Sequence, residues 1–242
     1  MSKHQWLRIA MIFIIGIVAW LTKDIYWVLG LLFLWSVIVA AGAYFIQLNF
    51  FINAKNKLVS ENSVALTFDD GPHPIYTTAA LAILKEKEVT ATFFLIGKNI
   101  AGNEHIVRQI VAEGHTIGNH SFAHNNFSPL WSAEKIIDDL SKNQHLLQSF
   151  TNAPIPYRPP FGVTNPTIAK AIKELNIAAI GWSLRSYDTV AKSSEMLLKK
   201  ILGNIKSKDI ILLHEAAPHT TTTLAVLIDG IKAKGYRFTT IE

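Results

Sequence analysis

Two adjacent carboxylates, Asp69 and Asp70, follow a short apolar run and precede a Gly-Pro pair. Neighbouring side chains at the end of a strand point in different directions. One carboxylate can therefore bind a cation while the other stays free to act as a base. The same Asp-Asp-Gly-Pro run also suits a turn, so this motif alone supports a metal site and a turn about equally.

A pair of histidines, His120 and His124, is the second candidate for chemistry. If this segment is helical, residues four apart lie on one face, which is the spacing of histidine-pair metal sites. With Asp70 they make a set of three ligands, and three protein ligands leave positions open for water and substrate, as in catalytic zinc sites. Taken alone, this spacing more often belongs to two incidental surface histidines.

Three further polar residues follow expected strands. Arg158 stands in a proline-stiffened loop, where its guanidinium could hold a carboxylate in a bidentate grip. His214 ends an apolar run, and Asp188, which follows another, could orient that histidine. Because α/β folds place their active sites at the C-terminal ends of strands, we expect all these side chains to gather at one edge of a sheet.

The elements that must position these side chains alternate between strands and helices. The apolar patterns predict strands at 63–68, 90–96, 115–119, near 157, and at 177–184, 209–213 and 237–241. They predict helices at 75–88, 103–113, 132–150, 165–175, 193–205 and 221–234, with Ser132 as an N-cap. Repeated units of this kind indicate an α/β fold with a parallel sheet. About seven units favour an irregular (β/α)7-type barrel. An open doubly wound sheet is the competing arrangement, but its glycine-rich phosphate loop is absent.

Two apolar runs precede this pattern, and the second, at 25–46, carries no charge. We expect transmembrane helices at about 6–22 and 25–47, since about 20 apolar residues cross a bilayer. The alternative is a cleaved signal peptide followed by a core helix, for which a small-residue cleavage site is missing. The expected division is a membrane anchor at 1–52, a linker at 53–61 and a catalytic domain at 62–242. The lysine and arginine distribution does not decide the orientation.

The composition narrows the kind of site and partner. The chain has 242 residues and no cysteine, which excludes disulfides, thiolate catalysis and cysteine-bound metal. Its formal net charge is +5, but no dense block of lysine and arginine is present. A nucleic-acid partner is therefore set aside, and nothing in the sequence indicates a protein partner.

In combination, the motifs are far more specific than each is alone. The runs Thr67–Pro72, His120–His124 and Arg158–Gly162 resemble those of the polysaccharide deacetylase family, which is carbohydrate esterase family 4 and contains chitooligosaccharide and peptidoglycan deacetylases. The resemblance extends from about residue 62 to the C-terminus, and the order of strands and helices also agrees with it.

The resemblance implies a role for each matching residue. It implies Asp70, His120 and His124 as metal ligands and Asp69 as the general base, positioned by Arg158. It further implies His214 as the general acid, tuned by Asp188. The backbone N–H of Phe161 would help to form the oxyanion hole, and Leu212 would line the acetyl pocket.

The same resemblance implies a metal-dependent hydrolase that removes N-acetyl groups from an N-acetylglucosamine polysaccharide such as peptidoglycan or chitin. The expected metal is Zn²⁺, although Co²⁺, Ni²⁺ or Mn²⁺ could occupy such a site. Because such polymers lie outside the cytoplasm, we expect an integral protein of the cytoplasmic membrane, held in the lipid bilayer by residues 6–47, with its catalytic domain on the outer side.

Three positions depart from the family pattern. Arg185 and Thr189 stand where the family's fourth motif often has an Asp and a Trp, and Glu215 follows His214 where an Asp is usual. The lost aromatic removes part of an apolar wall, which bears on substrate preference. Two alternatives remain: an esterase that removes O-acetyl groups from a polysaccharide, and a non-catalytic glycan-binding homologue.

Overall fold

The computed structural model describes residues 2–241. Strand β2 (Ser63–Gly71) is the central strand, and every residue in it except Asp70 is buried. It pairs in parallel with β3 (Thr92–Leu95) on one side and with β7 (Ile210–His214) on the other. A strand covered on both faces is a nearly continuous apolar run, and for this reason the sequence pattern located β2 well.

The remaining strands extend this sheet into a barrel. Strand β4 (Thr116–Asn119) pairs with β3, and β6 (Leu184–Arg185) pairs with β7. Single bridges at Tyr157 join β4 to β5 (Ala179–Ile180). With Tyr157 taken as one position, the order is β6, β7, β2, β3, β4, Tyr157, β5. The predicted irregular (β/α)7-type barrel is confirmed. Strand β8 (Arg237–Phe238) pairs only with the start of β2.

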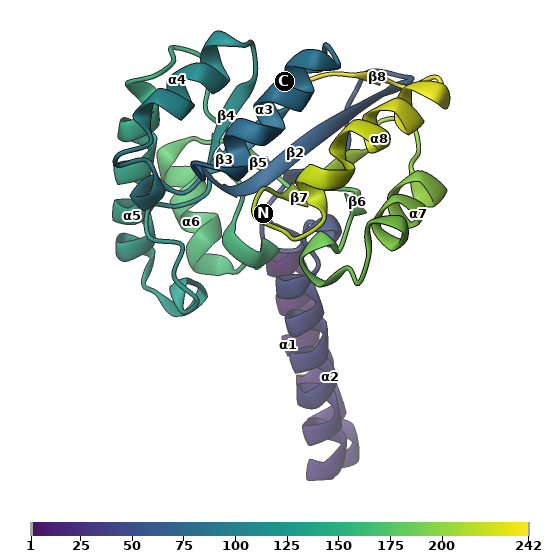
Figure 1. The fold of residues 1–242 in the computed structure, drawn as a ribbon. Helices are drawn as coiled ribbons and strands as arrows, with labels where there is room; N and C mark the ends of the chain where they lie inside the picture. Colours follow the sequence, from purple (N-terminus) through teal and green to yellow (C-terminus); the bar gives the residue numbers. More distant parts are fainter. Residues whose placement is uncertain (1, 242) are drawn as a thin grey trace.

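Helices cover the strands, as the alternating pattern predicts (Figure 1). They are α3 (Tyr76–Glu86), α4 (Glu104–Ala112), α5 (Ala133–Gln148), α6 (Pro166–Leu175), α7 (Ser194–Asn204) and α8 (Thr220–Ala233). Ser132 caps α5, because its hydroxyl accepts a hydrogen bond from the Lys135 N–H. The main core lies between helices and strands and includes the stacked rings of Phe68 and Phe93, 5.1 Å apart.

The strand predicted at 177–184 is broken into β5 and β6. The Gly181 N–H donates to the Lys55 carbonyl, and the Gly181 carbonyl accepts from the Arg158 side chain. These bonds take the Gly181 backbone out of the ladder. The strand predicted at 237–241 is likewise shorter in the structure, and the segment near Tyr157 contributes only single bridges.

An N-terminal hairpin of two helices projects from the barrel (Figure 1). Helix α1 (Lys3–Thr22) and helix α2 (Ile25–Tyr44) meet at Lys23, which has a left-handed conformation, and Asp24, which caps α2. Their mean hydropathies are 1.8 and 2.1, and Gly42 is the one buried residue within them. By length and composition both helices can cross a membrane, although a signal sequence passes the same test.

The residues between hairpin and barrel pack against the barrel. A short 3-10 helix, η1 (Ile46–Leu48), follows α2, and β1 (Ala54–Lys55) pairs with β5. Buried residues of this segment share an apolar cluster with barrel residues. The segment contributes Ile46, Phe50, Phe51, Ile52 and Leu58, and the barrel contributes residues that include Trp182 and Leu212. Residues 45–61, expected to be partly anchor and partly linker, are therefore folded onto the domain. Their apolar side chains suit a protein core as well as a bilayer.

Candidate functional site

The two adjacent carboxylates end the central strand and diverge. Asp69 pairs in register with His214 of β7, so these two residues are neighbours across the sheet. Asp70 has a φ of 76°, which lies in the left-handed region and is uncommon for a residue other than glycine. As a result, the Asp69 carboxylate lies beside Arg158, whereas the Asp70 carboxylate lies beside the two histidines.

Asp70, His120 and His124 form a candidate metal centre. The Oδ1 atom of Asp70 lies 3.3 Å from Nε2 of His124 and 3.5 Å from Nε2 of His120. This oxygen is buried and has no hydrogen-bond partner. One ligand atom from each residue lies within 4.8 Å of the others. An unsatisfied buried oxygen beside two imidazole nitrogens is costly without a cation, so these residues fit a divalent metal.

The protonation of these three groups also suits a metal. Nδ1 of His120 lies 2.9 Å from the Arg158 carbonyl oxygen, which only accepts, so Nδ1 carries the proton and Nε2 is free to bind. Burial would raise the pKa of Asp70. Contact with His120 and the charges of the histidines outweigh this effect and hold the pKa of Asp70 at about 2. Burial and then His120 lower the pKa of His124 to about 4. At neutral pH an anionic carboxylate thus faces a neutral His124.

The histidine segment, residues 120–124, is not helical. Ser121 has a φ of 67° and His124 a φ of 44°, so turns, rather than one helix face, bring the two rings to 4.9 Å. Helix α5 holds these turns: the Asp139 carboxylate accepts from the N–H groups of Phe122 and Ala123 at 2.9 and 3.0 Å. This role of Asp139 was not predicted, because nothing in the sequence distinguishes it from the other acidic residues of the predicted helices.

Arg158 is fully buried beneath the site. Its Nη1 donates to Asp69 Oδ1 at 2.8 Å and to Thr67 Oγ1 at 2.7 Å, while Nη2 donates to the Gly181 carbonyl. The guanidinium carbon lies 4.1 Å from the centroid of the Phe94 ring. The expected bidentate grip is wrong, because only one nitrogen contacts the carboxylate. Arg158 instead ties Asp69 to Thr67 of the same strand and to Gly181, which lies between β5 and β6.

His214 and Asp188 form a hydrogen-bonded pair. Asp188 Oδ1 lies 2.9 Å from His214 Nδ1, and Oδ2 accepts from the His214 backbone N–H and the Thr220 hydroxyl. Burial alone would lower the pKa of His214, but the hydrogen bond and charge of Asp188 more than offset it and raise that pKa. Burial would raise the pKa of Asp188, and the bond to His214 outweighs it and lowers that pKa.

These groups open into one cavity of about 410 Å³. Seven of the nine predicted site residues line it: Asp69, Asp70, His120, His124, Phe161, Leu212 and His214. Arg158 and Asp188 lie behind them, fully buried. Phe161 has a φ of 60° and is 44% exposed, and its ring centroid is 4.8 Å from that of His124.

Three other lining residues, Tyr44, Trp182 and Arg185, were not predicted as site residues. Tyr44 is the last residue of α2, and the sequence placed it at the end of a membrane helix. The Thr164 N–H donates to the Ala43 carbonyl at 2.9 Å, which fastens the end of α2 beside the Phe161 turn. No local pattern signals this contact, because its partners are about 120 residues apart.

Comparisons with known proteins agree with the geometry. The profile of the polysaccharide deacetylase family matches residues 56–180, a range that holds all three candidate metal ligands. The chain is 34% identical over 188 residues to a peptidoglycan-N-acetylglucosamine deacetylase of Bacillus cereus, covering 76% of this chain and 88% of the relative. It is 31% identical to a chitooligosaccharide deacetylase of Azorhizobium caulinodans, covering 73% and 91%.

A solved structure is similar over the same extent. It is the crystal structure of the Bc1960 peptidoglycan N-acetylglucosamine deacetylase in complex with 4-naphthalen-1-yl-N-oxidanyl-benzamide. The TM-score is 0.72 at 32% identity, and the match covers 78% of this chain and 90% of that one.

Proposed function

The chain belongs to the polysaccharide deacetylase family of metal-dependent hydrolases, and from that premise we propose that it removes N-acetyl groups from an N-acetylglucosamine-containing polysaccharide. The products are acetate and a glucosamine unit with a free amine. Peptidoglycan and chitin-like chains are the substrate class that its relatives' names suggest.

The observation that carries the proposal is the unpartnered Oδ1 of Asp70, buried between Nε2 atoms of His120 and His124. These three residues would hold Zn²⁺, for which two histidines and one carboxylate are a common catalytic set. When bound, a divalent metal supplies Lewis acidity toward the acetyl carbonyl and toward water. Co²⁺, Ni²⁺ or Mn²⁺ would fit the same ligand types.

Asp69 is the general base in this proposal. It takes a proton from the attacking water, and a positioned base of this kind contributes about 10²–10⁴-fold to the rate. Arg158 binds only Oδ1 of Asp69, so Oδ2 remains to accept that proton. Because Arg158 is also bonded to Thr67 and Gly181, it fixes the base at one place in the cavity.

His214 is the general acid. Its Nδ1 is bonded to Asp188, so Nε2 can give a proton to the departing amine, which is otherwise a poor leaving group. The backbone N–H of Phe161 stabilises the oxyanion, a contribution of about 3–4 kcal/mol per donor. Leu212, which lines the cavity, forms the wall against the acetyl methyl group.

The membrane assignment is part of the same proposal. The hairpin anchors the chain in the cytoplasmic membrane through residues 6–47, and residues 62–242 form the catalytic domain on the outer side, where envelope polymers lie. Residues 53–61 connect the two. The two long apolar helices support this arrangement, and an outer active site places both termini outside and the Lys23 turn inside.

The test is acetate release by the full chain in detergent, from N-acetylglucosamine oligomers and from peptidoglycan, with zinc and with chelator. We expect release with zinc and its loss with chelator. An O-acetylated xylan is the matched ester substrate. Zinc-dependent release from the ester with none from either amide substrate would overturn the proposal in favour of an O-acetyl esterase.

A further inference from the structure

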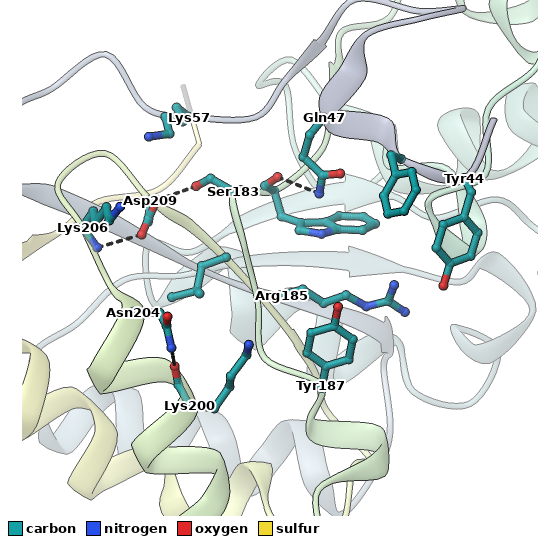
Figure 2. Close-up of a pocket in the computed structure, with 13 residues that line it drawn as sticks. Tyr44, Gln47, Lys57, Ser183, Arg185, Tyr187, Lys200, Asn204, Lys206 and Asp209 are labelled. Atoms are coloured by element: carbon teal, nitrogen blue, oxygen red, sulfur yellow. Dashed lines mark hydrogen bonds between the residues drawn. The ribbon is translucent and has the colours of Figure 1, made fainter. Parts of the chain in front are cut away.

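A second cavity of about 450 Å³ adjoins the catalytic cavity (Figure 2). The two cavities share three lining residues, Tyr44, Trp182 and Arg185. The second cavity therefore lies next to the place where the acetamido group would be held, within reach of a substrate longer than one sugar.

Cationic side chains dominate the lining of this second cavity. Lys57, Arg185, Lys200 and Lys206 all line it, and Asp209 is its one acidic residue. In the part of the chain that the structure describes, none of the four cations forms an ion pair. Asp209 is buried, and its carboxylate accepts from the Ser183 hydroxyl and the Lys206 backbone N–H, so it is already satisfied by neutral donors.

Two of these cations lie against the same aromatic ring. The Arg185 guanidinium carbon is 5.1 Å and the Lys200 Nζ 5.3 Å from the centroid of Tyr187. In Figure 2, Arg185 extends between Tyr187 and Tyr44, and Lys200 lies on the other side of Tyr187 in this view. Cations that lack an ion-pair partner attract an anion that enters the cavity they line.

We propose that this cavity is a phosphate-binding subsite of the catalytic cleft, filled by a phosphate group that the amino-sugar substrate carries. The inference rests on the proposed function, which puts the acetamido sugar in the adjoining cavity. Four cations against one carboxylate leave three unbalanced positive charges. A terminal phosphate monoester carries about two negative charges and a phosphodiester carries one, and the oxygens of either match Arg185 in bidentate geometry.

Such a phosphate has two possible sources. It can join the sugar to a lipid, or it can belong to the glycan chain itself. Tyr44 and Phe45, at the end of the candidate membrane helix α2, form part of the cavity wall. The subsite therefore opens where the bilayer surface would be, which favours a sugar that is linked through its phosphate to a membrane lipid.

The first experiment measures binding, so that it does not depend on activity. The full chain, in nanodiscs of neutral phosphatidylcholine, is titrated calorimetrically with N-acetylglucosamine 1-phosphate and with N-acetylglucosamine. We expect about tenfold or greater preference for the phosphorylated sugar, since one charged hydrogen bond accounts for about that factor. The double variant Lys200→Gln/Lys206→Gln should lose the preference. Equal affinities in the wild-type chain would overturn the proposal.

The matched control is Lys199→Gln, an exposed lysine on α7 that does not line the cavity. We expect it to keep the preference. If it loses the preference as fully as the double variant does, general surface charge rather than a subsite is responsible, and the proposal fails.

Two further arms separate the sources. If phosphatidylglycerol in the nanodisc displaces the phosphorylated sugar, and the double variant abolishes that competition, the cavity holds a bilayer headgroup and the substrate subsite is overturned. Faster acetate release from a prenyl-phosphate-linked sugar than from an N-acetylglucosamine oligomer with a terminal phosphate supports the lipid-linked source. Phosphate preference in binding without acetate release from any substrate would support the subsite and refute the proposed function.

Discussion

At the scale of single residues, Asp188 accepts four hydrogen bonds in a buried position. Besides the ring, the backbone N–H of His214 and the Thr220 hydroxyl, the Thr189 N–H donates to Oδ1 at 3.0 Å. A carboxylate so fully satisfied stays ionised and is held in one orientation. It therefore fixes both the position and the protonation of the His214 ring.

This pair predicts a change in the pH profile. A general acid must carry its proton, so activity falls as pH rises through the pKa of His214. Asp188 raises that pKa and burial lowers it, so Asp188→Asn should move the alkaline limb of kcat/KM to lower pH. The profile would be measured on N-acetylglucosamine oligomers. The exposed Asp138→Asn is the control, and an unmoved limb in Asp188→Asn would contradict the role of His214.

Glu215, next to His214, predicts a pH dependence of stability. Burial raises the pKa of the Glu215 carboxyl from 4.5 to about 8. The hydrogen bond from Thr77 opposes this shift, and the negative charge of Asp70 adds to it. Between these two values the folded chain holds a proton that the unfolded chain has released. The stability should therefore fall as pH rises from about 4.5 to about 8.

The measurement is urea unfolding of the metal-free chain in detergent across that pH range. Glu215→Gln keeps the shape of the protonated side chain, so its free energy of unfolding should vary less with pH than that of the wild-type chain. Glu174→Gln, at an exposed site on α6, should behave as the wild type does. If the free energy of unfolding of Glu215→Gln varies with pH as much as that of the wild-type chain, a group other than Glu215 is responsible for the pH dependence.

At the scale of elements, helix α5 supports the candidate metal centre. Asn143 donates to Asn119 Oδ1 and to the carbonyls of Leu95 and Ser121, each at 2.9 Å. One turn earlier, Asp139 binds two N–H groups of the histidine segment. The ends of β3 and β4 and the histidine segment that follows β4 are thus fixed by one face of α5.

Asp139→Ala should loosen the histidine segment without removing a ligand. We expect zinc affinity to fall about 10–100-fold, as for other outer-shell partners, and the free energy of unfolding to fall by about 1–3 kcal/mol. Calorimetric zinc titration and urea unfolding measure the two effects. Asp138→Ala, on the same helix but exposed, is the matched control. Unchanged zinc affinity in Asp139→Ala would show that the turns at residues 120–124 keep their conformation without Asp139, and would contradict its positioning role.

Much of this element order is predictable from the sequence, for a physical reason. Buried parallel strands such as β2 are uniformly apolar, and helices such as α5 carry both an apolar face and a cap, so each is encoded locally. The break at Gly181 depends instead on Lys55 and Arg158, which are distant in sequence. For the same reason the turns at Ser121 and His124 could not be told from a helix by spacing alone.

At the scale of the whole molecule, the hairpin and the active site are joined. The Gln47 amide donates to the Trp182 carbonyl at 3.2 Å, and Tyr44 lines the catalytic cavity. The sequence separates an apolar anchor from a catalytic domain, but it does not show that the end of α2 forms part of the wall of the cavity. Apolar residues such as Phe50 have the same signature in a bilayer as in a core.

A charge in the middle of α2 tests the membrane assignment. Phe33 is 72% exposed, so Phe33→Asp would disturb little in water, whereas an Asp at the centre of a membrane helix costs about 2.5–3.5 kcal/mol. We expect a smaller share of the variant than of Phe33→Leu to remain with membranes after an alkaline carbonate wash. Mass spectrometry should find the N-terminus intact, and a chain shortened by about 15–30 residues would identify a cleaved signal peptide instead.

The most direct test of the central claim is acetate release from N-acetylglucosamine oligomers by zinc-loaded wild-type chain and Asp69→Asn, with the bound zinc measured in both. The account predicts equal zinc content, release by the wild-type chain that chelator stops, and release at least about 100-fold slower from Asp69→Asn. Asp138→Asn should match the wild type. Undiminished release by Asp69→Asn, or none by the zinc-loaded wild-type chain, would contradict the account.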